Sequence, residues 1–164
     1  MKPADIFQLL QRRITTMSKE VAKIKLLREG ARIPTRGSEK AAGWDIYSCT
    51  DEEVIIAPGE MVKVPTGISI TPPPGYFGAI FARSGLSTKQ GLRPANCVGV
   101  CDEDYTGPYI VALYNDSDEP QHIPSGTRIA QLVFMPYKDI VFLEVDELRE
   151  TDRGRNGFGS TGNQ

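Results

Sequence analysis

The stretch that organises this chain is NCVGVCDEDYTGPYI, residues 96–110. It starts as an apolar segment, reaches three consecutive carboxylates at Asp102, Glu103 and Asp104, and continues into a second apolar segment at 109–113. This pattern predicts a β-hairpin with a tight acidic turn. Asp102 directly follows the apolar run, so we expect its carboxylate to turn inward, whereas Glu103 and Asp104 suit a solvated turn. An inward carboxylate is costly unless it is used, which makes Asp102 a candidate for chemistry. An acidic turn without a chemical role is the alternative.

Outward from this stretch, the sequence is typical of an all-β protein. Sixteen glycines and twelve prolines are spread along 164 residues and separate many short apolar segments. That spacing predicts a single jelly-roll-like barrel of about a dozen strands. The expected strands cover 23–27, 44–48, 54–57, 61–64, 68–71, 76–82, 98–101, 110–115, 121–123, 128–135 and 142–145.

Two segments depart from the β pattern. Residues 84–90, followed by Gly91, are predicted to form the one short helix of the domain. Residues 4–19 carry apolar side chains at helical spacing and several basic ones, which predicts a helical N-terminal extension over 1–22. We consider three interpretations of this extension: an ordinary packing helix, a non-native leader or an organelle-targeting signal. The barrel is then expected over 23–152, with a Gly-rich tail at 153–164.

Composition limits the chemistry that this chain can perform. The net charge is −2, so a polyanionic ligand needs a local cluster of donors. His122 is the only histidine, which argues against a zinc site and a Ser-His-Asp triad. Three cysteines without a Cys-x-x-Cys pair indicate buried, reduced thiols. With no membrane-length apolar run and no signal sequence, we expect an intracellular protein, cytoplasmic or nuclear, that binds neither membrane nor nucleic acid.

Four further stretches carry groups suited to a phosphate ligand. Asp45 lies between Trp44 and Ile46 on a predicted strand, so alternation points it to the other face. RSGLSTK at 83–89 joins a strand to a helix start, where free amides, an arginine and a hydroxyl can cradle an anion. A surface-exposed Asp and a plain capped helix are the alternatives for these two stretches.

The other two stretches lie nearer the C-terminus. In RIAQLVF at 128–134, Gln131 lies on an otherwise apolar strand and needs a polar partner unless its face is exposed. Alternation predicts that Ile129 shares a face with Gln131. The tail RGRNGFGSTGNQ at 153–164 has groups for anionic oxygens and a phenyl ring for stacking, but too many glycines to fold alone. A frayed terminus is the default, and a lid that closes over a ligand is the alternative.

Together and in this order, the five stretches resemble the five motifs of the trimeric deoxyuridine triphosphatase (dUTPase) family. The motifs are Ala42 to Ser48, Arg83 to Lys89, Asn96 to Gly107, Gly126 to Val133 and Arg153 to Gly162, and the similarity spans about residues 22–164. The resemblance implies hydrolysis of dUTP to dUMP and pyrophosphate by a homotrimer whose sites draw on three subunits. It also implies Mg²⁺ as the cofactor.

The resemblance assigns a role to each matching residue. Asp102 is implied to be the base that orients the water attacking the α-phosphorus. Tyr105 is implied to lie against the deoxyribose, and Asp45 to act on Mg²⁺ through water. The remaining implied contacts are Asn96, Gly99, Val100 and Ile110 for uracil; Arg83, Ser84, Gly85 and Gln131 for the phosphates; and Arg153, Phe158, Gly159, Ser160 and Thr161 for the lid.

Three positions differ from the usual family pattern, and two other functions compete. Cys101 replaces a β-branched residue and should loosen the seat of the base slightly, Trp44 replaces a Tyr, and Pro108 removes one backbone donor. A dCTP deaminase-like enzyme is the first alternative, which Tyr105 and the complete tail argue against. A nucleotide-gated interaction protein that binds its partner through the N-terminal segment is the second.

Overall fold

The structure is a computed structural model that describes residues 20–154. The predicted N-terminal helix at 4–19 and the tail residues from 155 onward, including Phe158 to Thr161, therefore lie outside the described residues. Within 20–154 the chain forms twelve strands and one short helix, as the all-β pattern predicts. Their bounds are β1 Lys23–Leu26, β2 Thr35–Arg36, β3 Trp44–Tyr47, β4 Val54–Ile56, β5 Met61–Pro65, β6 Ile68–Thr71, β7 Tyr76–Phe81, α2 Ser84–Gln90, β8 Leu92–Pro94, β9 Val98–Cys101, β10 Ile110–Asn115, β11 Gln121–Ile123 and β12 Arg128–Pro136.

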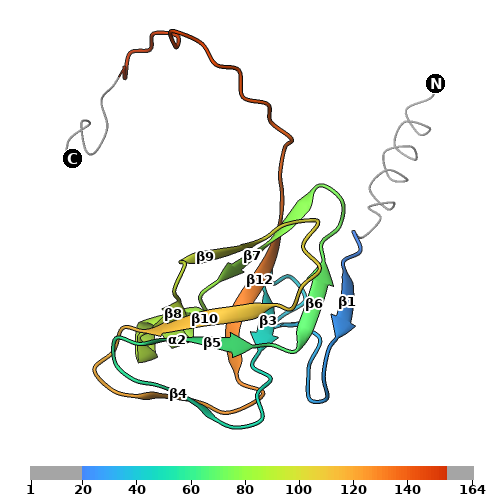
Figure 1. The fold of residues 1–164 in the computed structure, drawn as a ribbon, viewed down its shortest axis with the longest axis vertical. Helices are drawn as coiled ribbons and strands as arrows, with labels where there is room; N and C mark the ends of the chain where they lie inside the picture. The colour runs from blue at the N-terminus through green and yellow to red at the C-terminus, as the bar shows by residue number, and fades with distance from the viewer. Residues whose placement is uncertain (1–19, 155–164) are drawn as a thin grey trace, which may run out of the picture.

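The strands form four antiparallel sheets that enclose one core (Figure 1). The largest has the order β2-β3-β12-β7-β9, and a three-stranded sheet has the order β5-β10-β8. Two-stranded sheets pair β1 with β6 and β11 with β4. Buried aliphatic side chains from all four sheets, among them Ile46, Ile56, Ile70 and Leu113, meet in a single cluster. Strand β9 at the edge of the large sheet keeps Val98 and Val100 exposed, so this edge remains available for a ligand or a partner.

The single helix forms where the sequence predicts it. Helix α2 covers Ser84–Gln90 and buries Leu86 against the core. Gly91 ends it with a left-handed backbone conformation (φ 63°), which glycine adopts without steric cost. The preceding strand β7 ends at Phe81, and the helix begins directly after Arg83, where the second motif was expected.

One strand of the large sheet contains an irregularity that the alternation pattern missed. The pairing of β12 with β3 shifts between Arg128 and Ala130, so Ile129 bulges. As a result Ile129 and Ala130 are both buried, although a regular strand would place them on opposite faces. The predicted sharing of one face by Ile129 and Gln131 is therefore wrong.

Two other expectations about strands are also wrong. Strands β9 and β10 do not pair with each other: β9 pairs with β7, while β10 pairs with β5 and β8. The predicted hairpin is thus opened, with its two arms in different sheets. The strand expected at 142–145 does not form, because after β12 the chain runs away from the barrel as an extended arm (Figure 1).

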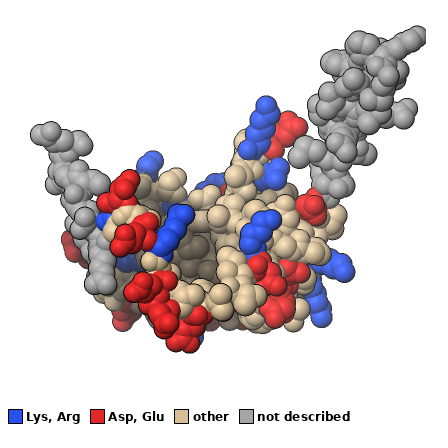
Figure 2. All heavy atoms as spheres, turned by 90° about the horizontal axis from the view of Figure 1, so that it is seen from above, with Lys and Arg blue, Asp and Glu red and all other residues tan. Residues whose placement is uncertain are grey.

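The surface carries both signs of charge. Figure 2 shows acidic and basic side chains interspersed on one face, with broad uncharged areas between them. This distribution agrees with the small net charge, so the binding of an anion depends on local groups. None of the helices in residues 20–154 is both long and apolar enough to cross a membrane.

Candidate functional site

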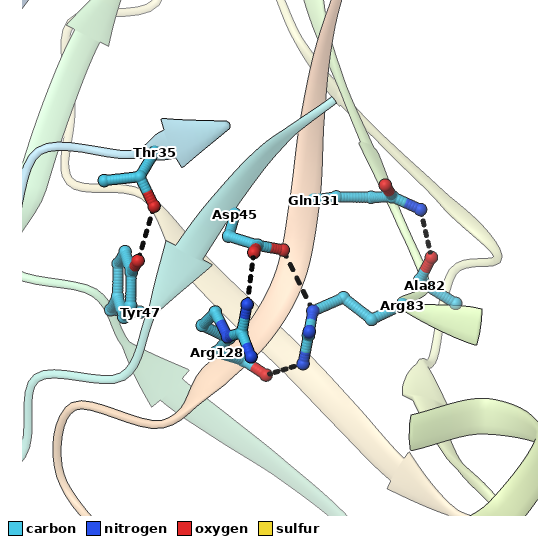
Figure 3. Close-up of polar contacts among 7 residues, drawn as sticks. All are labelled: Thr35, Asp45, Tyr47, Ala82, Arg83, Arg128 and Gln131. Atoms are coloured by element: carbon cyan, nitrogen blue, oxygen red, sulfur yellow. Dashed lines mark hydrogen bonds and ion pairs between the residues drawn. The ribbon is translucent and has the colours of Figure 1, made fainter. Parts of the chain in front are cut away.

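Asp45 on β3 lies between two arginines that are distant in sequence (Figure 3). Its Oδ1 accepts a hydrogen bond from Arg83 Nε at 2.9 Å, and its Oδ2 accepts one from an Arg128 guanidinium nitrogen at 3.1 Å. Arg83 also donates to the Arg128 carbonyl at 3.0 Å. Two guanidinium groups around one carboxylate leave one positive charge in excess. The cluster therefore orients its arginines and still favours an anion.

The register of the large sheet brings this cluster together. Asp45 is opposite Gln131, and Gln131 is opposite Phe81 on the next strand. Gln131 finds the partner that its position required, because its Nε2 donates to the Ala82 carbonyl at 2.8 Å. These residues line a cleft of about 620 Å³ together with Gly37, Ala41 to Gly43, Cys97 and Val133. The first, second and fourth motifs thus meet in one region, with Arg83 reaching Asp45 at the edge of the cleft.

Ser84 and Gly85 extend the same region at the start of α2. Both residues are exposed, and no side chain caps the helix start. A Cβ atom at Gly85 would meet nothing within 4 Å, so the space beside its backbone is open. Uncapped amides with open space in front of them can donate hydrogen bonds to an oxyanion, as the sequence predicted.

The surroundings of Asp45 fit an indirect contact with Mg²⁺. Both Asp45 oxygens accept a hydrogen bond from an arginine, so a cation bound directly to Asp45 would lie beside two guanidinium groups that repel it. Within residues 20–154, no three His, Cys, Asp or Glu side chains gather as a metal site. Mg²⁺ commonly takes few protein carboxylates and completes its shell with phosphate oxygens and water. A water-mediated role for Asp45 is compatible with that preference.

The opened hairpin provides a different kind of surface. β9 is the edge strand of the large sheet, so in the described chain its outer backbone groups have no strand partner. Val100 on β9 and Ile110 at the start of β10 are exposed, whereas Gly99 is buried against Ile80. Exposed backbone donors and acceptors between apolar side chains suit a flat heterocycle that hydrogen-bonds through its edge. Asn96 stands at the entrance to β9, next to Cys97, whose φ is 58°.

The acidic turn differs from the sequence expectation. The Tyr105 amide donates to the Asp102 carbonyl at 3.2 Å, which closes a four-residue turn. Asp102 is exposed, and it is Glu103 that turns back towards the protein. The amide of Gly75 and the hydroxyl of Tyr137 both donate to Glu103 Oε2, each at 2.8 Å. The prediction that Asp102 is the inward carboxylate is therefore wrong for this chain, because the anchor residue is Glu103.

Tyr105 lies flat across its own turn. Its hydroxyl donates to the Pro108 carbonyl at 2.9 Å. A Cβ at position 107 would approach the Tyr105 hydroxyl oxygen to 2.6 Å, so only glycine leaves room for the ring. The Tyr105 ring is therefore held rigidly in the same turn as Asp102. It remains partly exposed, so a ligand can contact it.

Asp102 and the arginine cluster are far apart in one chain. Phe81 pairs with Val98 near the cluster, whereas Gly78 pairs with Cys101 at the far end of β9. Asp102 is four residues beyond Val98, a separation of roughly 13 Å at about 3.3 Å per residue. Asp102 instead lines a second cleft, with Phe77, Val100, Glu103, Asp104 and Tyr137. One chain therefore carries two partial sites.

Sequence reasoning missed two of the residues that shape these sites. Arg128 grips Asp45, and its position three residues before Gln131 was the available signal. Tyr137 follows β12 and gave no signal, because its contact with Glu103 joins positions 34 residues apart. Arg153 lies in the exposed arm, and the other predicted lid residues are outside the described part of the chain.

Cys101 and Tyr109 form a packed pair beneath the acidic turn. Tyr109 is 1% exposed, and within the described chain its hydroxyl has no hydrogen bond of suitable geometry. A Cβ added to Gly78 would lie 3.3 Å from this hydroxyl and 3.4 Å from Cys101 Cβ, so the three groups are adjacent. Burial raises the pKa of the Cys101 thiol, and burial with the nearby thiol raises the pKa of Tyr109. Both groups therefore stay neutral and act through packing.

Comparison with known proteins points to one family. The family model described as "dUTPase" matches residues 29–162. The deoxyuridine 5'-triphosphate nucleotidohydrolase of Desulfitobacterium hafniense is 48% identical over 132 residues, which cover 80% of this chain and 87% of that protein. The enzyme of the same name from Syntrophotalea carbinolica is 44% identical over 140 residues, covering 85% and 95%.

Solved structures agree with these sequences. A point mutant of the dUTPase of Staphylococcus bacteriophage 80alpha, in complex with dUpNHpp, has a TM-score of 0.79 at 30% identity and covers 87% of this chain and 98% of that one. A point mutant of the dUTPase from phage phi11 of S. aureus has a TM-score of 0.70 at 27% identity, covering 77% and 97%, and is described as revealing the coordination of a structural Mg(II) ion.

The contact between Cys101 and Tyr109 predicts a coupled stability effect. Cys101→Ile adds volume against the Tyr109 hydroxyl and should lower the free energy of unfolding by about 1–3 kcal/mol, as overpacking does. In a Tyr109→Phe background the same substitution should cost clearly less, because the hydroxyl is gone. Tyr109→Phe alone is the control and should change stability by less than about 1 kcal/mol. Urea unfolding of the four proteins measures the cycle, and an equal cost in both backgrounds would contradict the contact.

Proposed function

The chain belongs to the dUTPase family, and we propose that it hydrolyses dUTP to dUMP and pyrophosphate with Asp102 as the residue that activates the attacking water. As a member of this family it is a dUTP diphosphatase in nucleotide metabolism. The observation that carries the assignment of roles is the open edge of β9, which leads directly into Asp102. A base bound along that edge lies next to the carboxylate.

In the proposed reaction Asp102 accepts a proton from water as the water oxygen attacks the α-phosphorus. The bond from the α-phosphorus to the bridging oxygen breaks, and pyrophosphate leaves. An exposed carboxylate at the start of a closed turn suits this role, because it can meet a water molecule while its backbone is held by the bond from the Tyr105 amide. Tyr105 packs against the deoxyribose and leaves no room for a 2′-hydroxyl.

The edge of β9 selects the base. Backbone groups of Gly99, Val100 and Ile110, with the Asn96 side chain, pair with uracil and leave cytosine with unmatched donors and acceptors. Backbone groups of a strand are fixed more firmly than side chains, so the wrong base cannot readily be accommodated. Val100 and Ile110 are exposed on either side, so apolar surface is available there to pack against the base.

The arginine cluster receives the phosphates. Arg83, Ser84, Gly85 and Gln131 hold the triphosphate oxygens, and Arg128 keeps Asp45 oriented. Mg²⁺, when bound, neutralises charge on the triphosphate, and Asp45 contacts it through water. Residues 153–164 close over the nucleotide as a lid through Arg153, Phe158, Gly159, Ser160 and Thr161. The barrel domain spans 23–152 in this proposal.

We propose a homotrimer in which neighbouring chains complete each site. Two observations support assembly. Asp102 and Arg83 lie at opposite ends of the β7 and β9 pair, too far apart to hold one α-phosphate within a single chain. The arm after β12 exposes large apolar side chains, including Val141 at 89% and Phe142 at 95%. Apolar surface of this kind is normally covered by a partner.

The alternative functions receive different support. The match to the dUTPase family model and to nucleotidohydrolases argues against a dCTP deaminase. Phage dUTPases from Staphylococcus are described as controlling the transfer of virulence genes by a G protein-like mechanism. For this chain, the segment that such a function was expected to use lies outside the described residues. We also propose an intracellular location, which the three free thiols support. The expectation that all three are buried is wrong, because Cys97 is exposed and Cys101 is only half-buried.

An assay of pyrophosphate release tests the function. We expect dUTP to be hydrolysed at least about a hundredfold more efficiently, by kcat/KM, than dCTP, dTTP or UTP, because unpaired polar groups penalise the wrong base and Tyr105 blocks the ribose. Removal of Mg²⁺ with a chelator should lower the rate. Ammonia release from dCTP, or equal hydrolysis of UTP, would contradict the proposal.

Asp102→Asn tests the assignment of the base. The amide cannot accept the proton, so kcat should fall by about two to four decades while dUTP still binds. The turn should persist, because its hydrogen bond uses the backbone carbonyl of residue 102. Asp104→Asn is the matched control in the same turn and should retain most of the activity. An Asp102→Asn protein with more than a tenth of wild-type kcat would remove Asp102 from this role.

A further inference from the structure

Glu103 has a different environment from the two aspartates beside it. Asp102 and Asp104 are exposed, whereas Glu103 is half-buried. The Gly75 amide and the Tyr137 hydroxyl both donate to the same oxygen, Glu103 Oε2, at 2.8 Å. A carboxylate that holds a backbone amide and a phenol at once is fixed in position.

The two donors are themselves joined. The Tyr137 amide donates to the Gly75 carbonyl at 3.1 Å, so Glu103, Gly75 and Tyr137 form a closed hydrogen-bonded triangle. Each corner comes from a different part of the chain. Glu103 lies in the turn after β9, Gly75 in the proline-rich turn before β7, and Tyr137 directly after β12. The triangle therefore joins the acidic turn to the point where the C-terminal arm leaves the barrel (Figure 1).

The ionisation of the two side chains supports this arrangement. The Gly75 amide, and then the Tyr137 hydroxyl, lower the pKa of Glu103. The bond to Glu103 is the largest cause that raises the pKa of Tyr137, and Asp139 and Asp104 raise it further. At neutral pH the carboxylate is thus ionised and the phenol protonated, as a hydrogen bond from Tyr137 to Glu103 requires.

Glu103 and Asp102 share one turn, so the anchor on Glu103 constrains the backbone that carries Asp102. The two residues are adjacent, and the turn is closed by the bond from the Tyr105 amide to the Asp102 carbonyl. With Glu103 held against Gly75, Asp102 remains exposed at the edge of the second cleft. Tyr137 lines the same cleft. Release of Glu103 would free the turn to move, and the backbone that carries Asp102 would move with it.

We propose that Glu103 and Tyr137 are positioning residues for the hydrolysis, which hold the catalytic turn in register with the base of the C-terminal arm. The inference rests on the proposed role of Asp102 and adds two residues that act by holding the turn rather than by reacting with the substrate. The arm carries the proposed lid, so the hydrogen bond from Tyr137 to Glu103 joins the turn that carries Asp102 to the base of that arm.

The test is a double-mutant cycle on the full-length chain with dUTP and Mg²⁺. Tyr137→Phe removes only the hydroxyl, and Glu103→Ala removes the acceptor. Each should lower kcat about tenfold with KM changed less than about twofold, because a displaced base loses rate rather than substrate binding. The double variant should be no slower than Glu103→Ala alone, because both changes break the same contact. Glu103→Gln keeps an acceptor oxygen for both donors and should retain at least about half of kcat.

The controls remove comparable groups elsewhere. Tyr114→Phe changes a half-buried tyrosine on β10, and Glu53→Gln changes the glutamate that bonds His122 at 2.9 Å. Both should leave kcat unchanged. If Glu103→Ala does not fold, the milder pair Tyr137→Phe and Glu103→Gln decides the question, with the unfolding midpoint recorded for each.

The outcomes separate this inference from the function on which it rests. A kcat for Tyr137→Phe equal to that of the wild type, or losses that multiply in the double variant, would overturn the positioning role while Asp102→Asn remains inactive. A wild-type protein that releases no pyrophosphate from dUTP would overturn the proposed function and this inference with it. A loss in KM rather than kcat would show that the triangle serves substrate binding, and would also overturn the proposal.

Discussion

The pairing of β9 with β7 is the constraint on which the rest of the site depends. A paired strand has a fixed length per residue, so the register from Phe81–Val98 to Gly78–Cys101 sets the separation between the arginine cluster and Asp102. The same pairing leaves the outer edge of β9 free, and it takes β9 away from β10. The base-reading edge and the phosphate cluster therefore belong to one sheet and still cannot meet within one chain. In our account assembly of three chains brings them together.

The polar contacts of the two partial sites serve different purposes. Asp45 orients two arginines from separate strands and leaves a positive surplus that favours phosphate. Glu103 is anchored by neutral donors, while its neighbour Asp102 is exposed. Asp45 and Glu103 thus make many contacts, and neither is the carboxylate that we assign to proton transfer. A carboxylate that must accept a proton from water has to keep an oxygen available, and Asp102 does.

The sequence predicted the local features of this chain well. Helix α2 and its Gly91 end follow from the rules for helix ends, and the strands expected at 44–48 and 128–135 form to within one residue of those bounds. It could not predict that β9 and β10 enter different sheets, because the acidic turn between them is typical of a hairpin. The bulge at Ile129 and the exposed arm at 142–145 were also missed, since both depend on contacts beyond the local pattern. Glu103 was assigned to solvent because its partners, Gly75 and Tyr137, are distant in sequence.

The central claim, that different chains supply Asp102 and Arg83 to one site, can be tested by complementation. Asp102→Asn and Arg83→Ala proteins, each inactive alone, are mixed in equal amounts, unfolded and refolded together, and assayed with dUTP. If the residues come from different subunits, about a quarter of the sites receive both intact residues after random reassembly, and about a quarter of wild-type activity returns. If both residues act within one chain, every site lacks one of them. Activity no higher than that of the separate variants would contradict the account.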